Sequence, residues 1–251
     1  SAEPEIYQAT RTFGTILENV VLDPETSRVD LTDTSKTENT RAAYPITQIP
    51  NASLTGYAGQ PHEVIFLTAD AFGVLPPVAK LTYEQAQYYF ISGYTAKLAG
   101  TERGVSEPQA TFSVCFGAPF MPLRPGVYAD LLARKMQENN VNVWLVNTGW
   151  TGGPYGTGER MPISYTREII RAILEARLAR IDTVTEKAFG LSIPVKCPGV
   201  PDRVLDPRQT WSDPAAYDVQ ARKLAAMFQD NFKAFADTVS ADIANAGPPV
   251  S

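Results

Sequence analysis

The chain has 251 residues, 44% of them hydrophobic, which is enough to build the core of one large domain or two smaller ones. Its 22 basic and 27 acidic residues give a net charge of −5, which argues against a general nucleic-acid binder and against a membrane-surface binder. No apolar run approaches the roughly 20 residues that a membrane-spanning helix needs. We therefore expect neither a nucleic-acid partner nor a membrane partner.

The spacing of the cysteines and the first five residues indicate the cellular compartment in which the chain is expected. Cys115 and Cys197 lie far apart without CxxC spacing, so the sequence indicates neither a disulfide framework nor a zinc site. Residues 1–5 are acidic and lack the charged-then-apolar pattern of a secretory leader. A reducing, cytoplasmic setting is the simplest interpretation.

The first part of the chain has the composition of β-structure. Residues 16–22 and 28–31 are rich in apolar side chains and flank a turn-forming segment, 23–27, a pattern that predicts a β-hairpin. A polar loop, 34–41, follows. Residues 62–70 have an unbroken, β-branched apolar centre, which predicts a buried strand.

Helices and strands alternate through the middle. The capping-box pattern of residues 82–85 predicts a helix that continues to about Leu98 and ends at Gly100. Residues 111–116 are expected to form another strand, and residues 128–137 a helix with one apolar face.

A glycine-rich loop is the most informative feature. The apolar run 141–146 predicts a strand, five glycines follow within the ten residues 149–158, and a periodic helix is expected from about Ser164. Open α/β sheets place ligands at such strand–loop–helix junctions. Arg160, at the end of the loop, is a forked donor suited to phosphate, ribose or a purine face. A ligand loop and a mobile surface loop both remain open, but a Walker A loop is excluded because no Gly-Lys-Ser/Thr follows the glycines.

The last predicted helix spans residues 215–237. Together these elements predict a mixed α/β fold, with a mixed sheet flanked by helices.

Isolated polar side chains give weaker signals. His62 is the only histidine, so a multi-histidine metal site cannot be built, and a structural role is expected for it. Cys115 lies in an apolar segment and is expected to be an inert thiol. Asp70 ends the buried strand, where a functional carboxylate and a turn-stabilising role are both open. Residues 35–41 combine two cations, a carboxylate and several hydroxyl groups, which could cradle a phosphate or form an ordinary solvated loop.

Four segments, in this order, resemble signatures of the ATP-dependent phosphoenolpyruvate carboxykinases: residues 35–46, 64–77, 92–104 and 145–150. The similarity extends over nearly the whole chain. It implies that residues 1–251 form the C-terminal, mononucleotide-binding part of that fold.

The resemblance also implies an activity and its residues. The family is a group of lyases that convert oxaloacetate and ATP to phosphoenolpyruvate, CO2 and ADP in gluconeogenesis. By resemblance, Arg41 is the catalytic arginine that contacts the carboxylate substrate and the transferred phosphate. Arg160 and Met161 line the base and ribose, Thr166 contacts adenine, and Glu3 makes a further nucleotide contact. For Thr166, capping the following helix is the alternative.

Several family features are absent from these 251 residues. They include the phosphate-binding loop that ends in Gly-Lys-Thr and the lysine, histidine and aspartate that hold manganese. The resemblance therefore implies that Mg2+ and Mn2+ are bound by an N-terminal half and that this chain contributes no metal ligand. It also implies a monomer, and a chain that is inactive without that half. A non-catalytic adenine-nucleotide module and a structural domain remain alternatives, and residues 152–155 lengthen the glycine loop relative to shorter family members.

Overall fold

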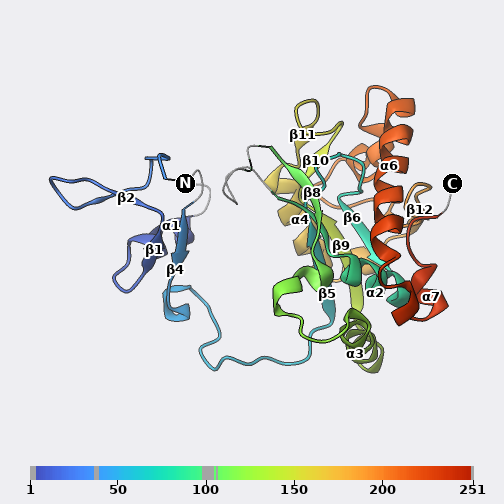
Figure 1. Cartoon of the computed structure of the whole chain (residues 1–251), viewed down its shortest axis with the longest axis horizontal. Coiled ribbons are helices and arrows are strands. Elements are labelled where there is room, and N and C mark those ends of the chain that lie inside the picture. The colour runs from blue at the N-terminus through green and yellow to red at the C-terminus, as the bar shows by residue number, and fades with distance from the viewer. Residues whose placement is uncertain (1–3, 37–39, 98–104, 106, 250–251) are drawn as a thin grey trace. The chain divides into compact units, whose positions relative to one another are not determined.

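The computed structural model of the chain describes residues 4–36, 40–97, 105 and 107–249. The chain forms two compact units (Figure 1). The first comprises residues 1–60 and 97–107, and the second comprises residues 61–96 and 108–251.

The first unit contains short helices and two small sheets. Its sheets pair β1 with β4 and β2 with β3, both antiparallel. The elements are α1 (Pro4–Arg11), β1 (Ile16–Glu18), β2 (Val21–Leu22), β3 (Val29–Asp30), β4 (Arg41–Ala43) and the 3-10 helix η1 (Ile46–Gln48).

The predicted hairpin is confirmed for β2 and β3, where the Asp23 carboxylate accepts hydrogen bonds from the N–H groups of Glu25 and Thr26 at 2.9 and 2.8 Å. The prediction of one continuous strand over residues 16–22 is wrong. Asn19 has a φ of 60°, and this left-handed residue divides the segment, so that β1 pairs with β4.

The second unit is built on a five-stranded mixed sheet with the order β12-β13-β6-β9-β5. β5 and β9 are parallel, and the other neighbours are antiparallel. The strands are β5 (Glu63–Thr68), β6 (Val78–Leu81), β9 (Asn142–Asn147), β12 (Thr183–Thr185) and β13 (Ser192–Pro194).

Helices cover both faces of this sheet, as Figure 1 shows for α6 and α4. They are α2 (Tyr83–Ser92), α3 (Pro125–Glu138), α4 (Ile163–Leu174), α5 (Asp202–Leu205), α6 (Pro214–Phe232) and α7 (Ala241–Ala244). Alternate residues of β9 enter two separate cores, since Val143 and Leu145 pack with α2, α3 and α6, whereas Trp144 and Val146 pack with α4. The expected mixed α/β fold with a sheet between helices is thus confirmed.

The helix expected to reach Leu98 is shorter than predicted. Its capping box at Thr82 and Gln85 is confirmed. However, α2 ends at Ser92, because Gly93 adopts the left-handed conformation, with φ 55°, and the chain continues as β7 (Tyr94–Lys97). A Cβ at Gly93 would overlap the carbonyl oxygen of Ser113, so the tight turn requires glycine.

The strand expected at residues 111–116 is also only partly correct. β8 (Gln109–Phe112) forms a small sheet with β7, and a 3-10 turn, η2 (Val114–Phe116), replaces the rest. Cys115 and Phe116 have φ values of 53° and 55°, which end the extended conformation. The predicted helices at 128–137, from 164 and at 215–237 correspond to α3, α4 and α6, although α6 ends at Phe232. No helix in the described ranges has both the length and the apolarity to cross a membrane.

Candidate functional site at the strand ends

The carboxyl ends of the two parallel strands meet at one edge of the sheet, where Thr68 of β5 lies opposite Asn147 of β9. Asn147 is fully buried and joins the two strand ends. Its Oδ1 accepts the N–H groups of Asp70 and Gly149 at 3.0 and 2.8 Å, and its Nδ2 donates to the carbonyl of Leu75 at 3.0 Å. No local pattern marks this asparagine, because two of its three partners, Asp70 and Leu75, are more than 70 residues away in sequence.

Asp70 holds the loop that follows β5. Its carboxylate is fully buried and accepts the N–H groups of Phe72, Val74 and Leu75 as well as the hydroxyl of Tyr94. Burial raises the pKa of Asp70, and these hydrogen bonds oppose the shift. Of the two roles left open by the sequence, the structure shows the turn-stabilising one.

The glycine-rich segment forms a β-hairpin. β10 (Trp150–Thr151) and β11 (Glu159–Arg160) pair antiparallel, and the N–H of Met161 donates to the carbonyl of Gly149 at 2.7 Å. The hairpin is tied to the loop after β5, because Trp150 N–H donates to Asp70 O at 2.8 Å and Tyr155 N–H donates to Ala71 O at 2.9 Å. The glycine-rich segment is therefore anchored to the loop after β5 by hydrogen bonds.

Glycines permit this close approach. Gly73 has a φ of 71°, and a Cβ at this position would overlap the carbonyl oxygen of Gly153. A third segment supports the hairpin, since the hydroxyl of Thr210 accepts Gly152 N–H at 3.0 Å and the indole of Trp211 donates to Gly73 O at 2.8 Å. The loop after β5, the hairpin and residues 210–211 therefore form one hydrogen-bonded assembly.

Arg160 lies at the end of the hairpin with an exposed side chain. Its guanidinium carbon is 5.6 Å from the centroid of the Trp150 ring, and its Nε donates to the carbonyl of Thr148 at 3.3 Å. These contacts hold the stem of Arg160 while the two Nη groups keep their donors available within the described part of the chain.

Met161 and Thr166 follow Arg160 directly. The Met161 side chain is buried in the core beneath α4, with Trp144 and Ile169. Thr166 is half-buried in the first turn of α4, and the N-cap of that helix is Pro162, which makes no side-chain cap bond. The capping alternative for Thr166 is therefore wrong, because the helix begins earlier than that role requires.

Arg41 belongs to the first unit, where it begins β4 opposite Glu18 with an exposed side chain. In the preceding loop, Lys36 donates to the carbonyl of Val20 at 2.9 Å. Arg160, Met161 and Thr166 lie close together in the second unit, whereas Arg41 belongs to the first unit. Glu3 lies outside the described residues.

Metal ligands do not cluster in the described ranges, which hold no group of three His, Cys, Asp or Glu side chains able to bind an ion. His62 is exposed just before β5, and its carbonyl accepts the N–H of Asn142 at 3.0 Å. The described residues therefore provide no ligand set of their own that would hold Mg2+ or Mn2+ without further donors.

A mixed sheet flanked by helices places the chain among the α/β proteins, in which ligands commonly bind at the carboxyl ends of parallel strands. A family model described as phosphoenolpyruvate carboxykinase matches residues 1–203. The chain belongs to the family of ATP-dependent phosphoenolpyruvate carboxykinases.

Similar proteins named phosphoenolpyruvate carboxykinase (ATP) occur in several bacteria. The protein of Pelobacter propionicus is 59% identical over 245 residues, which are 98% of this chain and 46% of that protein. The protein of Geotalea uraniireducens is 59% identical over 97% of this chain and 46% of its own length, and that of Thermus thermophilus is 54% identical over 98% and 46%. The chain thus spans about half the length of these relatives.

Proposed function

We propose that this chain is the C-terminal, nucleotide-binding part of an enzyme that converts oxaloacetate and ATP to phosphoenolpyruvate, CO2 and ADP. The observation that carries the proposal is 59% identity, over 98% of the chain, to a phosphoenolpyruvate carboxykinase (ATP). The anchored hairpin that presents Arg160 at the strand ends supports it. The chain is proposed to be inactive without the remaining part of the protein.

The proposed nucleotide wall consists of Arg160, Met161 and Thr166. Arg160 has a guanidinium plane held on Trp150 and Nη donors that can bond a ribose hydroxyl or stack on a purine. Thr166 carries a hydroxyl in the first turn of α4, within reach of an adenine edge in this proposal. Because the Met161 side chain is in the core, its contribution would come from its backbone and from the firm support that it gives to Arg160. Glu3 remains a proposed contact.

Arg41 is proposed as the catalytic arginine. Loss of CO2 from oxaloacetate leaves an enolate, whose oxygen attacks the γ-phosphorus of ATP while ADP departs. Charge moves between the carboxylate-bearing substrate and the transferred phosphoryl group during this step. A guanidinium fork can hold two anionic oxygens throughout, and phosphoryl transfer depends mainly on such positioning and charge stabilisation.

The proposed partner is the rest of the same protein, which would also hold the divalent cations and the phosphate-binding loop. β5 supports this idea. Its run Val64–Ile65–Phe66 is typical of a strand in the interior of a sheet, yet β5 lies at the edge of the sheet that the described residues form. A further segment of the complete protein could cover this edge.

The nucleotide wall can be tested in the complete protein with Arg160→Ala and Thr166→Ala. Loss of a charge-assisted hydrogen bond costs about 1.5–3 kcal/mol, so Arg160→Ala should weaken ATP binding by roughly tenfold or more, with little change in melting temperature. Arg171→Ala is the matched control, because Arg171 is an exposed residue of α4 that pairs with Glu168 at 2.9 Å. Unchanged ATP affinity in both test variants would show that the hairpin is only scaffolding.

A further inference from the structure

A cavity lies in the second unit, and none of its lining residues belongs to the hairpin or to α4. Its volume is about 610 Å³, within the range of sites that bind small molecules. Ile193 of β13 and Ala221 and Ala225 of α6 are buried along it, together with the ring of Tyr217. These buried side chains form the floor of the cavity, and Val184, which is 50% exposed, offers apolar surface to the body of a ligand.

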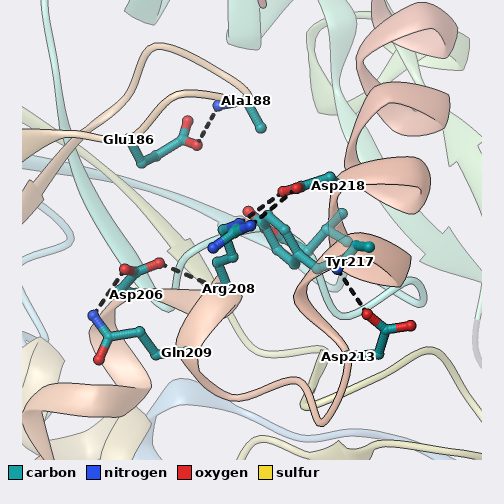
Figure 2. A network of polar contacts seen from close by, with 10 residues as sticks. Glu186, Ala188, Asp206, Arg208, Gln209, Asp213, Tyr217 and Asp218 are labelled. Atoms are coloured by element: carbon teal, nitrogen blue, oxygen red, sulfur yellow. Dashed lines mark hydrogen bonds and ion pairs between the residues drawn. The ribbon is translucent and has the colours of Figure 1, made fainter.

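Two of the three carboxylates around this cavity are engaged by local hydrogen bonds (Figure 2). Glu186 accepts the N–H groups of Ala188 and Phe189 at 2.8 and 2.6 Å. Asp206 accepts the N–H of Arg208 at 3.2 Å and the side-chain amide of Gln209 at 2.9 Å. Their oxygens therefore stabilise the protein's own turns.

The third carboxylate, Asp218, faces three cations. Arg208 reaches it with two hydrogen bonds, from Nε at 2.8 Å and from Nη2 at 3.1 Å. This contact, assisted by Arg222 and Lys187, holds the pKa of Asp218 below its usual value. Arg208 also interacts electrostatically with Asp206. Lys187 and Arg222 line the cavity as well, but they form no ion pair within the described ranges and remain available to a ligand.

We propose that this cavity binds a small organic anion, a carboxylate or a phosphate monoester with an apolar body. Lys187 and Arg222 hold the anionic group beside Arg208. The apolar body lies on Val184, above the floor formed by Ile193 and Ala221. Charged groups fix the orientation, and the apolar surface supplies contact area, as in other small-molecule sites. The site is independent of the proposed carboxykinase reaction, because it shares no residue with the nucleotide wall.

Two anionic probes and one neutral probe test this proposal on the complete protein. Benzoate and phenyl phosphate should bind and shift the amide NMR signals of Lys187 and Ala221, whereas benzyl alcohol, which has a similar ring without the charge, should bind more weakly. The tighter of the two anions identifies the ligand class. Equal affinity for the alcohol and for both anions would overturn the proposal.

Charge variants provide a second, signed test. Lys187→Gln and Arg222→Gln should each weaken anion binding by about two- to fivefold, the size expected for partly exposed charge pairs. Lys223→Gln is the matched control, since it removes one charge from the same helix, where the ammonium group lies 5.6 Å from the Phe72 ring centroid. It should leave the affinity unchanged.

Asp218→Asn should act in the opposite direction and tighten anion binding, because it removes the competing carboxylate and releases Arg208. Loss of a merely structural ion pair would lower stability without improving affinity, so the sign separates the two roles. Melting temperatures identify any variant that fails to fold, and the remaining variants then decide. Weaker or unchanged anion binding in folded Asp218→Asn would overturn the proposal.

Discussion

Replacement of Asp70 by asparagine should strongly destabilise the second unit although the side chain keeps its shape. Each carboxylate oxygen accepts two hydrogen bonds, Oδ1 from Phe72 N–H and Tyr94 hydroxyl and Oδ2 from Val74 N–H and Leu75 N–H. An amide has one accepting oxygen, so two donors lose their partner and face an N–H group instead.

The magnitude follows from those two bonds. An unsatisfied buried donor costs about 1–3 kcal/mol, so two cost about 2–6 kcal/mol. Burial of a charged carboxylate is itself unfavourable, which is why burial raises the pKa of Asp70. The uncharged asparagine avoids this desolvation cost, which offsets part of the loss. We expect a loss of about 2–4 kcal/mol from the free energy of unfolding, a large share of the roughly 5–15 kcal/mol typical of native proteins.

Urea unfolding followed by tryptophan fluorescence measures this loss, because the Trp211 indole is bonded to Gly73 in the same loop at 2.8 Å. Asp213→Asn is the control. Asp213 caps α6 through Ala215 N–H at 2.8 Å, and asparagine caps a helix about as well as aspartate. A loss below about 0.5 kcal/mol in Asp70→Asn would refute the idea that this network holds the loop.

Three further outcomes are expected. Gly73→Ala should lower the free energy of unfolding by more than Gly156→Ala does. Both glycines have a positive φ, but only a Cβ at Gly73 would meet the facing backbone. Equal losses in urea unfolding would contradict the close approach. In the complete enzyme, Arg41→Ala should lower turnover by roughly 10²–10³, and Arg41→Lys should restore little of it. Near-normal turnover of Arg41→Ala with only a raised Michaelis constant for ATP would exclude the catalytic role. The thiols of Cys115 and Cys197 should react slowly with iodoacetamide at pH 8 and faster towards pH 11, because burial raises each pKa to about 11; the rate of an unhindered thiol at pH 8 would contradict this.

Local sequence patterns were sufficient for much of the fold. The apolar run at 141–146 and the periodicity from Ser164 predicted β9 and α4 correctly. The pattern of apolar side chains within a single element is enough to indicate which of its faces are buried. The capping box at Thr82 marked the start of α2 for the same reason. The end of α2 was missed, since the need for glycine at Gly93 comes from Ser113, twenty residues away.

The candidate site was predicted less completely. The glycine segment and Arg160 were found from composition and resemblance, but the anchoring of the hairpin was not. Asn147 and Thr210 fix its geometry through partners distant in sequence, which no local pattern reveals. The roles of Arg41, Arg160, Met161 and Thr166 remain predictions from the family resemblance, and so does that of Glu3, outside the described residues.

Carboxykinase turnover with and without the rest of the protein is the most direct test of the central claim. The purified 251-residue chain would be assayed for ADP and phosphoenolpyruvate from ATP and oxaloacetate, with Mg2+ and Mn2+ present, and compared with the complete protein under the same conditions. We predict no turnover by the chain alone and metal-dependent turnover by the complete protein, which Arg41→Ala lowers by roughly 10²–10³. Metal-dependent turnover by the isolated chain, or its absence from the folded complete protein, would contradict the account.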